Sequence, residues 1–171
     1  MLISMNRRAG FTLIELLITI TIMVILMTLA VINLRSNQMA TRNEKRKADI
    51  TVIAQQLEDY YRGGSDPIAT YKAGQYPPTD FLNNESNIRT ALRDIDAKVL
   101  RAPDVAESAP ISLTMATSVV APTPNESTYV YLPLTAAGNL CQTGSQECRK
   151  FTLYYKLEGN ATIQTFVSKN Q

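Results

Sequence analysis

The chain has 171 residues, of which 45% are hydrophobic and 19% charged, and a formal net charge of +2. A balance this close to neutral disfavours a nucleic-acid-binding protein, which usually carries a strongly basic face. There is no His, the commonest general base and metal ligand, and no nucleophile–base pair, phosphate loop or set of metal ligands. We therefore expect no enzyme activity, no metal and no cofactor.

Residues 1–10 are basic and end in Ala9-Gly10, which predicts a cytoplasmic leader. The following run, residues 11–34, has 18 apolar residues among 24, and its only charged side chain is Glu15. As a helix rising about 1.5 Å per residue, this run is long enough to cross a hydrocarbon core of about 30 Å. A carboxylate in such a segment costs about 3 kcal/mol unless it is paired or neutralised.

A secretory signal is an alternative interpretation of this run, because Thr28-Leu29-Ala30 offers a small-x-small cleavage site after it. The apolar core of a cleaved signal is typically about 7 to 15 residues, however, and this run is longer.

The junction after the leader has the sequence RRAG at residues 7–10, followed by FTLIELL at residues 11–17. This pattern resembles the class III leader and N-terminal segment of type IV pilins and of the related pseudopilins of type II secretion. The resemblance implies that prepilin peptidase cuts between Gly10 and Phe11 and N-methylates the new amine of Phe11. It also implies that Glu15 pairs with the Phe11 amine of a neighbouring subunit. The position of Glu15 near the start of the run allows an alternative, in which its side chain extends to the membrane interface and is solvated there.

Residues 35–62 are predicted to continue the same helix, because residues 11–62 contain neither Pro nor Gly. An apolar stripe at intervals of three and four can pack on a sheet; it comprises Ile50, Ile53, Leu57 and Tyr60. Gly63-Gly64 is expected to end the helix. The family usually carries a Pro at the position of Ile32, and without it a continuous helix is favoured through Val24 to Ile32.

Residues 63–127 are predicted to be a connecting region with several Pro breaks, which in the family is the most variable part. Within it we expect a short helix at residues 86–98, since its apolar residues share one helix face. The apolar tract at residues 111–121 is expected to form a weak strand or a packed loop.

Residues 128–171 alternate in the manner of strands, at 128–134, 151–157 and 161–167, which predicts an antiparallel meander. The expected fold class is therefore α+β, with a small antiparallel sheet packed on the second half of a helix at about residues 11–62. Cys141 and Cys148 flank six residues rich in turn formers, which predicts a disulfide hairpin worth about 2 to 3 kcal/mol. Two free thiols or a metal site are the alternatives.

A basic cluster follows the apolar run and comprises Arg42, Lys45, Arg46 and Lys47. We expect a solvated helix face, with lipid headgroups, DNA or acidic residues of neighbouring subunits as alternative partners. These charges outweigh Arg7 and Arg8, so the positive-inside rule alone would keep the C-terminal domain in the cytoplasm. The leader and the cysteine pair both indicate the opposite orientation.

Three further groups are weaker candidates. Tyr60, Tyr61, Tyr71 and Tyr76 could form an aromatic surface, but we expect structural roles. Asp94 and Asp96 lack the neighbouring carboxylates that a calcium loop needs. Asn-x-Ser/Thr sequences begin at Asn84, Asn125 and Asn160.

The predicted function is that of a structural subunit of a type IV pilus. Loss of Arg7 and Arg8 from the 17 basic residues would leave 15 against 15 acidic ones, a neutrality that suits self-association. The protein partners that the resemblance implies are other copies, other pilins, prepilin peptidase, an assembly ATPase and its platform protein. It places the subunit in the cytoplasmic membrane, in contact with lipid, before assembly and on the cell surface afterwards. A pseudopilin and a membrane-anchored surface-binding protein are the alternatives; DNA binding is without support.

Overall fold

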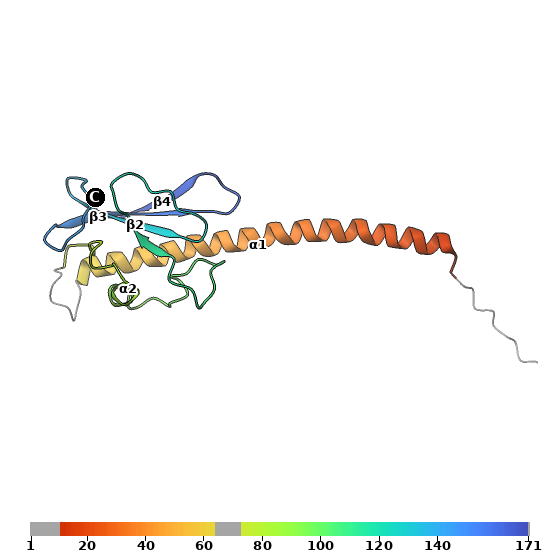
Figure 1. Ribbon diagram of the computed structural model, residues 1–171, viewed down its shortest axis with the longest axis horizontal. Helices are drawn as coiled ribbons and strands as arrows, with labels where there is room; N and C mark the ends of the chain where they lie inside the picture. Colours follow the sequence, from red (N-terminus) through yellow and green to blue (C-terminus); the bar gives the residue numbers. More distant parts are fainter. Residues whose placement is uncertain (1–10, 64–72, 171) are drawn as a thin grey trace, which may run out of the picture. The chain divides into compact units, whose positions relative to one another are not determined.

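The computed structural model describes residues 11–63 and 73–170 (Figure 1). Contacts divide the chain into two compact units, Met1–Met39 and Ala40–Gln171. Helix α1, Leu13–Gly63, begins in the first unit and ends in the second, close to the predicted bounds of about 11–62.

The first unit consists, where it is described, of the apolar half of α1. The helix is regular through Val24 to Ile32, so the continuous helix expected without a Pro is confirmed for a single copy. Three threonines along it donate their hydroxyls to carbonyls of the preceding turn: Thr19 to Leu16, Thr21 to Ile18 and Thr28 to Val24, at 2.7 to 2.8 Å. These hydroxyl groups therefore need no partner from outside the helix.

In the second unit, the predicted apolar stripe of α1 forms part of the core. Ile50, Ile53 and Leu57 are at most 1% exposed, and Tyr60 is 5% exposed. They belong to one apolar cluster with residues of the sheet, including Tyr129, Tyr131, Phe151 and Leu153. Burial of this stripe, at about 25 cal/mol per Å² of apolar surface, is the main favourable contribution to docking α1 on the sheet.

The sheet has four strands in the order β1-β2-β3-β4: β1 is Leu113–Met115, β2 Tyr129–Thr135, β3 Cys148–Lys156 and β4 Ile163–Val167. The antiparallel meander expected of β2, β3 and β4 is present. The sheet as a whole is mixed, however, because β1 pairs with β2 in parallel. Thirteen residues separate β1 from β2 (129 − 115 − 1), which is enough chain for the crossover that a parallel pair requires.

Helix α2, Glu85–Ala91, is shorter than the predicted helix at residues 86–98. The side chain of Asn84 caps its start by accepting a hydrogen bond from the amide of Asn87 at 2.9 Å. Beyond it, a carboxylate oxygen of Asp96 accepts from the amide of Lys98 at 2.9 Å. Acidic side chains that bond nearby amides favour turns over helix, so residues 96–98 form a turn where a continuing helix was predicted.

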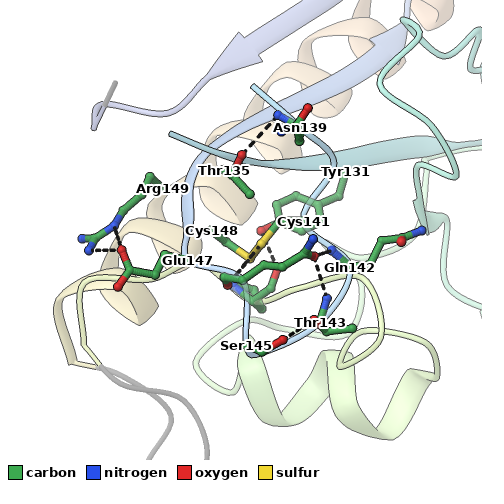
Figure 2. Close-up of a disulfide and its surroundings, with 12 residues drawn as sticks. Tyr131, Thr135, Asn139, Cys141, Gln142, Thr143, Ser145, Glu147, Cys148 and Arg149 are labelled. Atoms are coloured by element: carbon green, nitrogen blue, oxygen red, sulfur yellow. Dashed lines mark hydrogen bonds and ion pairs between the residues drawn. A yellow bond between two sulfur atoms is a disulfide. The ribbon is translucent and has the colours of Figure 1, made fainter. Parts of the chain in front are cut away.

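The predicted disulfide between Cys141 and Cys148 is confirmed, and both cysteines are buried. Figure 2 shows it at the base of an exposed loop, beside the ion pair between Arg149 and Glu147. The carbonyls of Cys141 and Cys148 accept hydrogen bonds from the amides of Thr79 and Tyr76 at 3.2 and 2.9 Å. The cross-link thus fixes the connecting region, as well as its own hairpin.

Candidate functional site

The start of α1 is a reciprocal capping box formed by Thr12 and Glu15. The amide and the hydroxyl of Thr12 donate to Oε2 of Glu15 at 2.8 and 2.9 Å, and the amide of Glu15 donates to the Thr12 hydroxyl at 3.2 Å. This arrangement satisfies amide groups that a helix start leaves without partners and holds the carboxylate against the first turn. In the described part of the chain, these bonds engage Oε2 of Glu15 and leave Oε1 open to a second partner.

The apolar side chains beyond Glu15 have no cover within the chain. Phe11 is 90% exposed, Leu13 is 87% exposed, and the large apolar residues from Ile14 to Leu34 are each roughly half exposed or more. By length and composition, α1 is the one described helix that could cross a membrane. An apolar surface of this extent requires lipid or other protein chains around it.

Gly10, the predicted residue before the scissile bond, lies outside the described residues. Phe11, the predicted new N-terminus and methylation position, is the first described residue. It lies four residues before Glu15, and the hydrogen bonds of the capping box join Thr12 and Glu15, so cleavage before Phe11 would leave that box intact.

The basic cluster proves to be only partly solvated, and the prediction is wrong for Arg46. Its guanidinium is fully buried and donates to Oε1 of Glu158 at 2.6 Å, to Oδ1 of Asp104 at 2.9 Å and to the carbonyl of Glu126 at 2.9 Å. A buried charge must be paired and hydrogen-bonded, and here the partners come from three separate loops of the same chain.

Arg42 and Asn43 complete this ion-pair network around Glu158. Arg42 forms a two-pronged ion pair with the Glu158 carboxylate. The side-chain amide of Asn43 accepts from the Glu158 amide at 2.8 Å and donates to its carbonyl at 3.1 Å. Lys47 pairs with Glu44 at 2.8 Å and stays exposed, as expected for a helix face. The network is therefore a clamp between α1 and the turn after β3.

Charge and burial shift two pKa values near this clamp in opposite directions. Hydrogen bonds from Arg42, reinforced by Arg46, lower the pKa of Glu158 to about 2. Burial raises the pKa of Asp49 to about 6, although Lys45, the Tyr129 hydroxyl and Arg46 all favour the charged form. Asp49 therefore contributes stability below its ordinary pKa of 3.8, which is lost as the pH rises through about 6.

The tyrosines occupy structural positions, in line with the prediction. Tyr76 is 1% exposed, its ring lies 4.6 Å from that of Tyr61 and 4.8 Å from that of Phe151, and its hydroxyl donates to Glu58 at 3.0 Å. Burial raises the pKa of Tyr76 to about 12. Tyr71 lies outside the described residues.

The remaining candidates also have local roles. Asp94 and Asp96 belong to no cluster: across residues 11–63 and 73–170, no group of three or more His, Cys, Asp or Glu could hold a metal. Asn125 and Asn160 accept hydrogen bonds from the amides of Ser127 and Thr162 at 2.9 and 2.8 Å and so shape their turns. Sequence reasoning missed Glu158 and Asp104 as partners of the basic cluster. Their involvement could have been suspected from Arg46, because it lies on the same side of the helix as the core residues Ile50 and Ile53 and a buried arginine needs acidic partners.

Comparison with known proteins identifies one family model, the prokaryotic N-terminal methylation motif, which matches residues 5–31. No curated protein and no solved structure matches the chain. The match covers the leader junction, the capping box and most of the exposed apolar surface, and it ends before the second unit.

The clamp makes a prediction for Glu158→Gln. The variant is expected to lower the free energy of unfolding at neutral pH by about 2 to 3 kcal/mol, because the buried Arg46 loses a charged partner. The folded pKa of about 2 lies below the ordinary value of 4.5, so the wild-type advantage holds above pH 4.5 and disappears as the pH falls toward 2.

Urea unfolding of the full chain in detergent, followed by tyrosine circular dichroism, measures this difference across the pH range. Comparing variant with wild type at each pH cancels the opposite contribution of Asp49. Glu147→Gln is the matched control, since its ion pair with Arg149 is exposed. A difference that stays constant from neutral pH to pH 2 would contradict the assignment.

Proposed function

We propose that this chain, which carries the class III signal peptide of type IV pilins and pseudopilins at residues 5–31, is a structural subunit of a type IV pilus. Prepilin peptidase removes residues 1–10, and the mature subunit polymerises through the apolar half of α1. Before assembly, that half anchors the subunit in the cytoplasmic membrane. The observation that carries the proposal is the exposed apolar helix with one ionisable side chain, Glu15, held at its first turn.

The energetics of Glu15 favour assembly over permanent anchoring. A carboxylate in a membrane segment costs about 3 kcal/mol, and the ammonium created at Phe11 by cleavage is a second expensive charge. If Oε1 of Glu15 receives the Phe11 amine of a neighbouring copy, the two charges compensate each other inside the filament core. The capping box supports this role because it orients the carboxylate and leaves that oxygen open.

The disulfide supports an outward orientation of the second unit. Structural disulfides persist in oxidising compartments, whereas thiols are kept reduced in the cytoplasm. The positive-inside rule counts Lys and Arg and gives little weight to neighbouring carboxylates, so the basic cluster after the apolar run still favours the opposite orientation. In this proposal the leader and the disulfide outweigh that count.

Glu15→Leu tests the assembly step. The variant should insert into the membrane and be processed normally, because it removes a charge from an apolar segment, but surface filaments should fall by about tenfold or more without the intersubunit pair. Electron microscopy of sheared filaments, with immunoblots of total and surface fractions, measures both effects. Glu44→Leu is the control, since Glu44 is an exposed carboxylate paired with Lys47. Normal filament abundance in Glu15→Leu would refute the pairing.

Gly10→Val tests the processing step. A branched side chain before the scissile bond should block cleavage, so the full-length precursor should accumulate as a heavier band on a gel. Ala9→Val places the same side chain one residue earlier and serves as the comparison. N-terminal sequencing of the wild type should give methylated Phe11, whereas an intact Met1 would indicate a permanently anchored protein. In electron microscopy, short filaments confined to the cell envelope would indicate a pseudopilin.

A further inference from the structure

Residues 11–39, the described part of the first unit, carry two charged side chains of opposite sign. Glu15 lies at the first turn of α1, and Arg35 lies 20 residues further along the same helix (35 − 15). At about 1.5 Å per residue, this separation spans about 30 Å, the thickness of a hydrocarbon core. With Glu15 at the inner boundary of the membrane, Arg35 therefore lies at the outer boundary, at the level of the lipid headgroups.

Arg35 is exposed, and the sequence around it offers no carboxylate. The residues three or four positions away, which are its neighbours on a helix face, are Val31, Ile32, Gln38 and Met39. The next acidic residue along the chain is Glu44, which is paired with Lys47 at 2.8 Å. An anionic partner for Arg35 therefore has to come from outside this stretch of the chain.

An apolar groove on one face of the helix ends at Arg35. It has a volume of about 470 Å³ and is lined by Val24, Met27, Thr28, Val31, Ile32 and Arg35. The hydroxyl of Thr28 donates to the carbonyl of Val24 at 2.7 Å, so this side chain presents its methyl group to a ligand without losing a hydrogen bond. From Val24 to Arg35 the groove extends about 16 Å along the helix, close to half of the hydrocarbon core, which is the depth of one lipid leaflet.

This layout fits a phospholipid of the outer leaflet in both shape and charge. An acyl chain can pack along the apolar part of the groove, while the phosphate at the headgroup level accepts hydrogen bonds from the guanidinium fork of Arg35. A helix of a second copy could cover the apolar part, but the only carboxylate in its residues 11–39 is Glu15, which the proposed pairing with Phe11 already uses. A phospholipid supplies the apolar chain and the anion together.

We propose that the membrane-resident subunit binds one phospholipid of the outer leaflet, with the phosphate at Arg35 and an acyl chain in the groove of residues 24–35. This inference rests on the proposed function, since it concerns the subunit before assembly, and it adds a ligand to that state. Together with Glu15 at the opposite boundary, the bound lipid fixes the depth of the apolar half of α1 in the membrane.

Native mass spectrometry of the full chain, released from detergent micelles that contain phosphatidylglycerol, tests the phosphate contact. The wild type should retain one phospholipid, and at least about tenfold less of a diacylglycerol with the same acyl chains, which lacks the phosphate. Arg35→Gln should reduce phospholipid retention at least about tenfold, whereas Arg35→Lys should keep part of it, because an ammonium preserves the charge without the fork. Arg62→Gln is the matched control, since Arg62 is an exposed arginine near the other end of α1.

A pair of phenylalanine variants tests the groove. Thr28→Phe places a ring in the groove and should reduce phospholipid retention at least about tenfold, because the ring occupies the space of the acyl chain. Thr19→Phe makes the same change on the opposite side of the helix, nine residues and two and a half turns earlier, and should leave retention unchanged. Both threonines donate their hydroxyls to carbonyls of the preceding turn, so both variants lose the same kind of bond.

Three results would overturn the lipid site. They are equal retention by the wild type and Arg35→Gln, equal retention by the two phenylalanine variants, and displacement of the lipid by inorganic phosphate. Dimers of the chain that form in place of the lipid complex would show that a second copy covers the groove and would overturn it as well.

The measurement uses single subunits and needs no filament, so the inference and the function on which it rests fail separately. Loss of the lipid site would leave the filament proposal standing, because Glu15→Leu tests that proposal by filament abundance. A retained phospholipid on a chain that forms no filaments would support the lipid site and overturn the filament proposal alone.

Discussion

The buried guanidinium of Arg46 is the constraint on which the arrangement of the second unit depends. Its side chain is 0% exposed, and it engages Glu158, Asp104 and the carbonyl of Glu126. Removing one partner from a buried ion pair typically costs about 3 to 5 kcal/mol, so the three loops that supply the partners cannot move away from α1 independently. The apolar stripe of Ile50, Ile53 and Leu57 provides affinity between helix and sheet, whereas the ion pairs define which loop meets which turn of the helix.

This clamp lies close to the boundary between the two units, which falls between Met39 and Ala40. From Arg42 onward, α1 is held by its own chain, through Glu158, the apolar cluster and the bonds of Glu58 to Tyr76 and to the amide of Lys169. Earlier in the helix, the large apolar side chains up to Leu34 are exposed. One continuous helix thus has two environments: its second half packs on its own sheet, and its first half presents an uncovered apolar surface that requires lipid or other protein chains around it.

Sequence reasoning predicted the features that depend on local pattern. Apolar periodicity gave the long helix and its core stripe, the alternation of 128–171 gave three strands, and the spacing of Cys141 and Cys148 gave the disulfide. The weak strand expected within residues 111–121 is β1. Sequence reasoning failed where distant residues decide: it did not predict that β1 pairs with β2 in parallel, and the burial of Arg46 depends on loops 58 to 112 residues away along the chain. The turn that Asp96 forms with the amide of Lys98 was a local signal that the apolar periodicity of residues 86–98 obscured.

Two free energies at the start of α1, the gain from the helix cap and the cost of the carboxylate in lipid, bear on why a processed subunit would leave the membrane. A helix cap of the Thr12–Glu15 kind contributes typically about 1 kcal/mol, less than the cost of about 3 kcal/mol for a carboxylate in a membrane segment. The capping box therefore reduces the cost of Glu15 without removing it, and the unpaired ammonium of Phe11 adds to what remains. In the proposed filament, each of these groups finds its partner on a neighbouring copy. Because the residual cost exists only in the isolated subunit, it favours the assembled state, and the capping box keeps the carboxylate fixed on the first turn with one oxygen open for that partner.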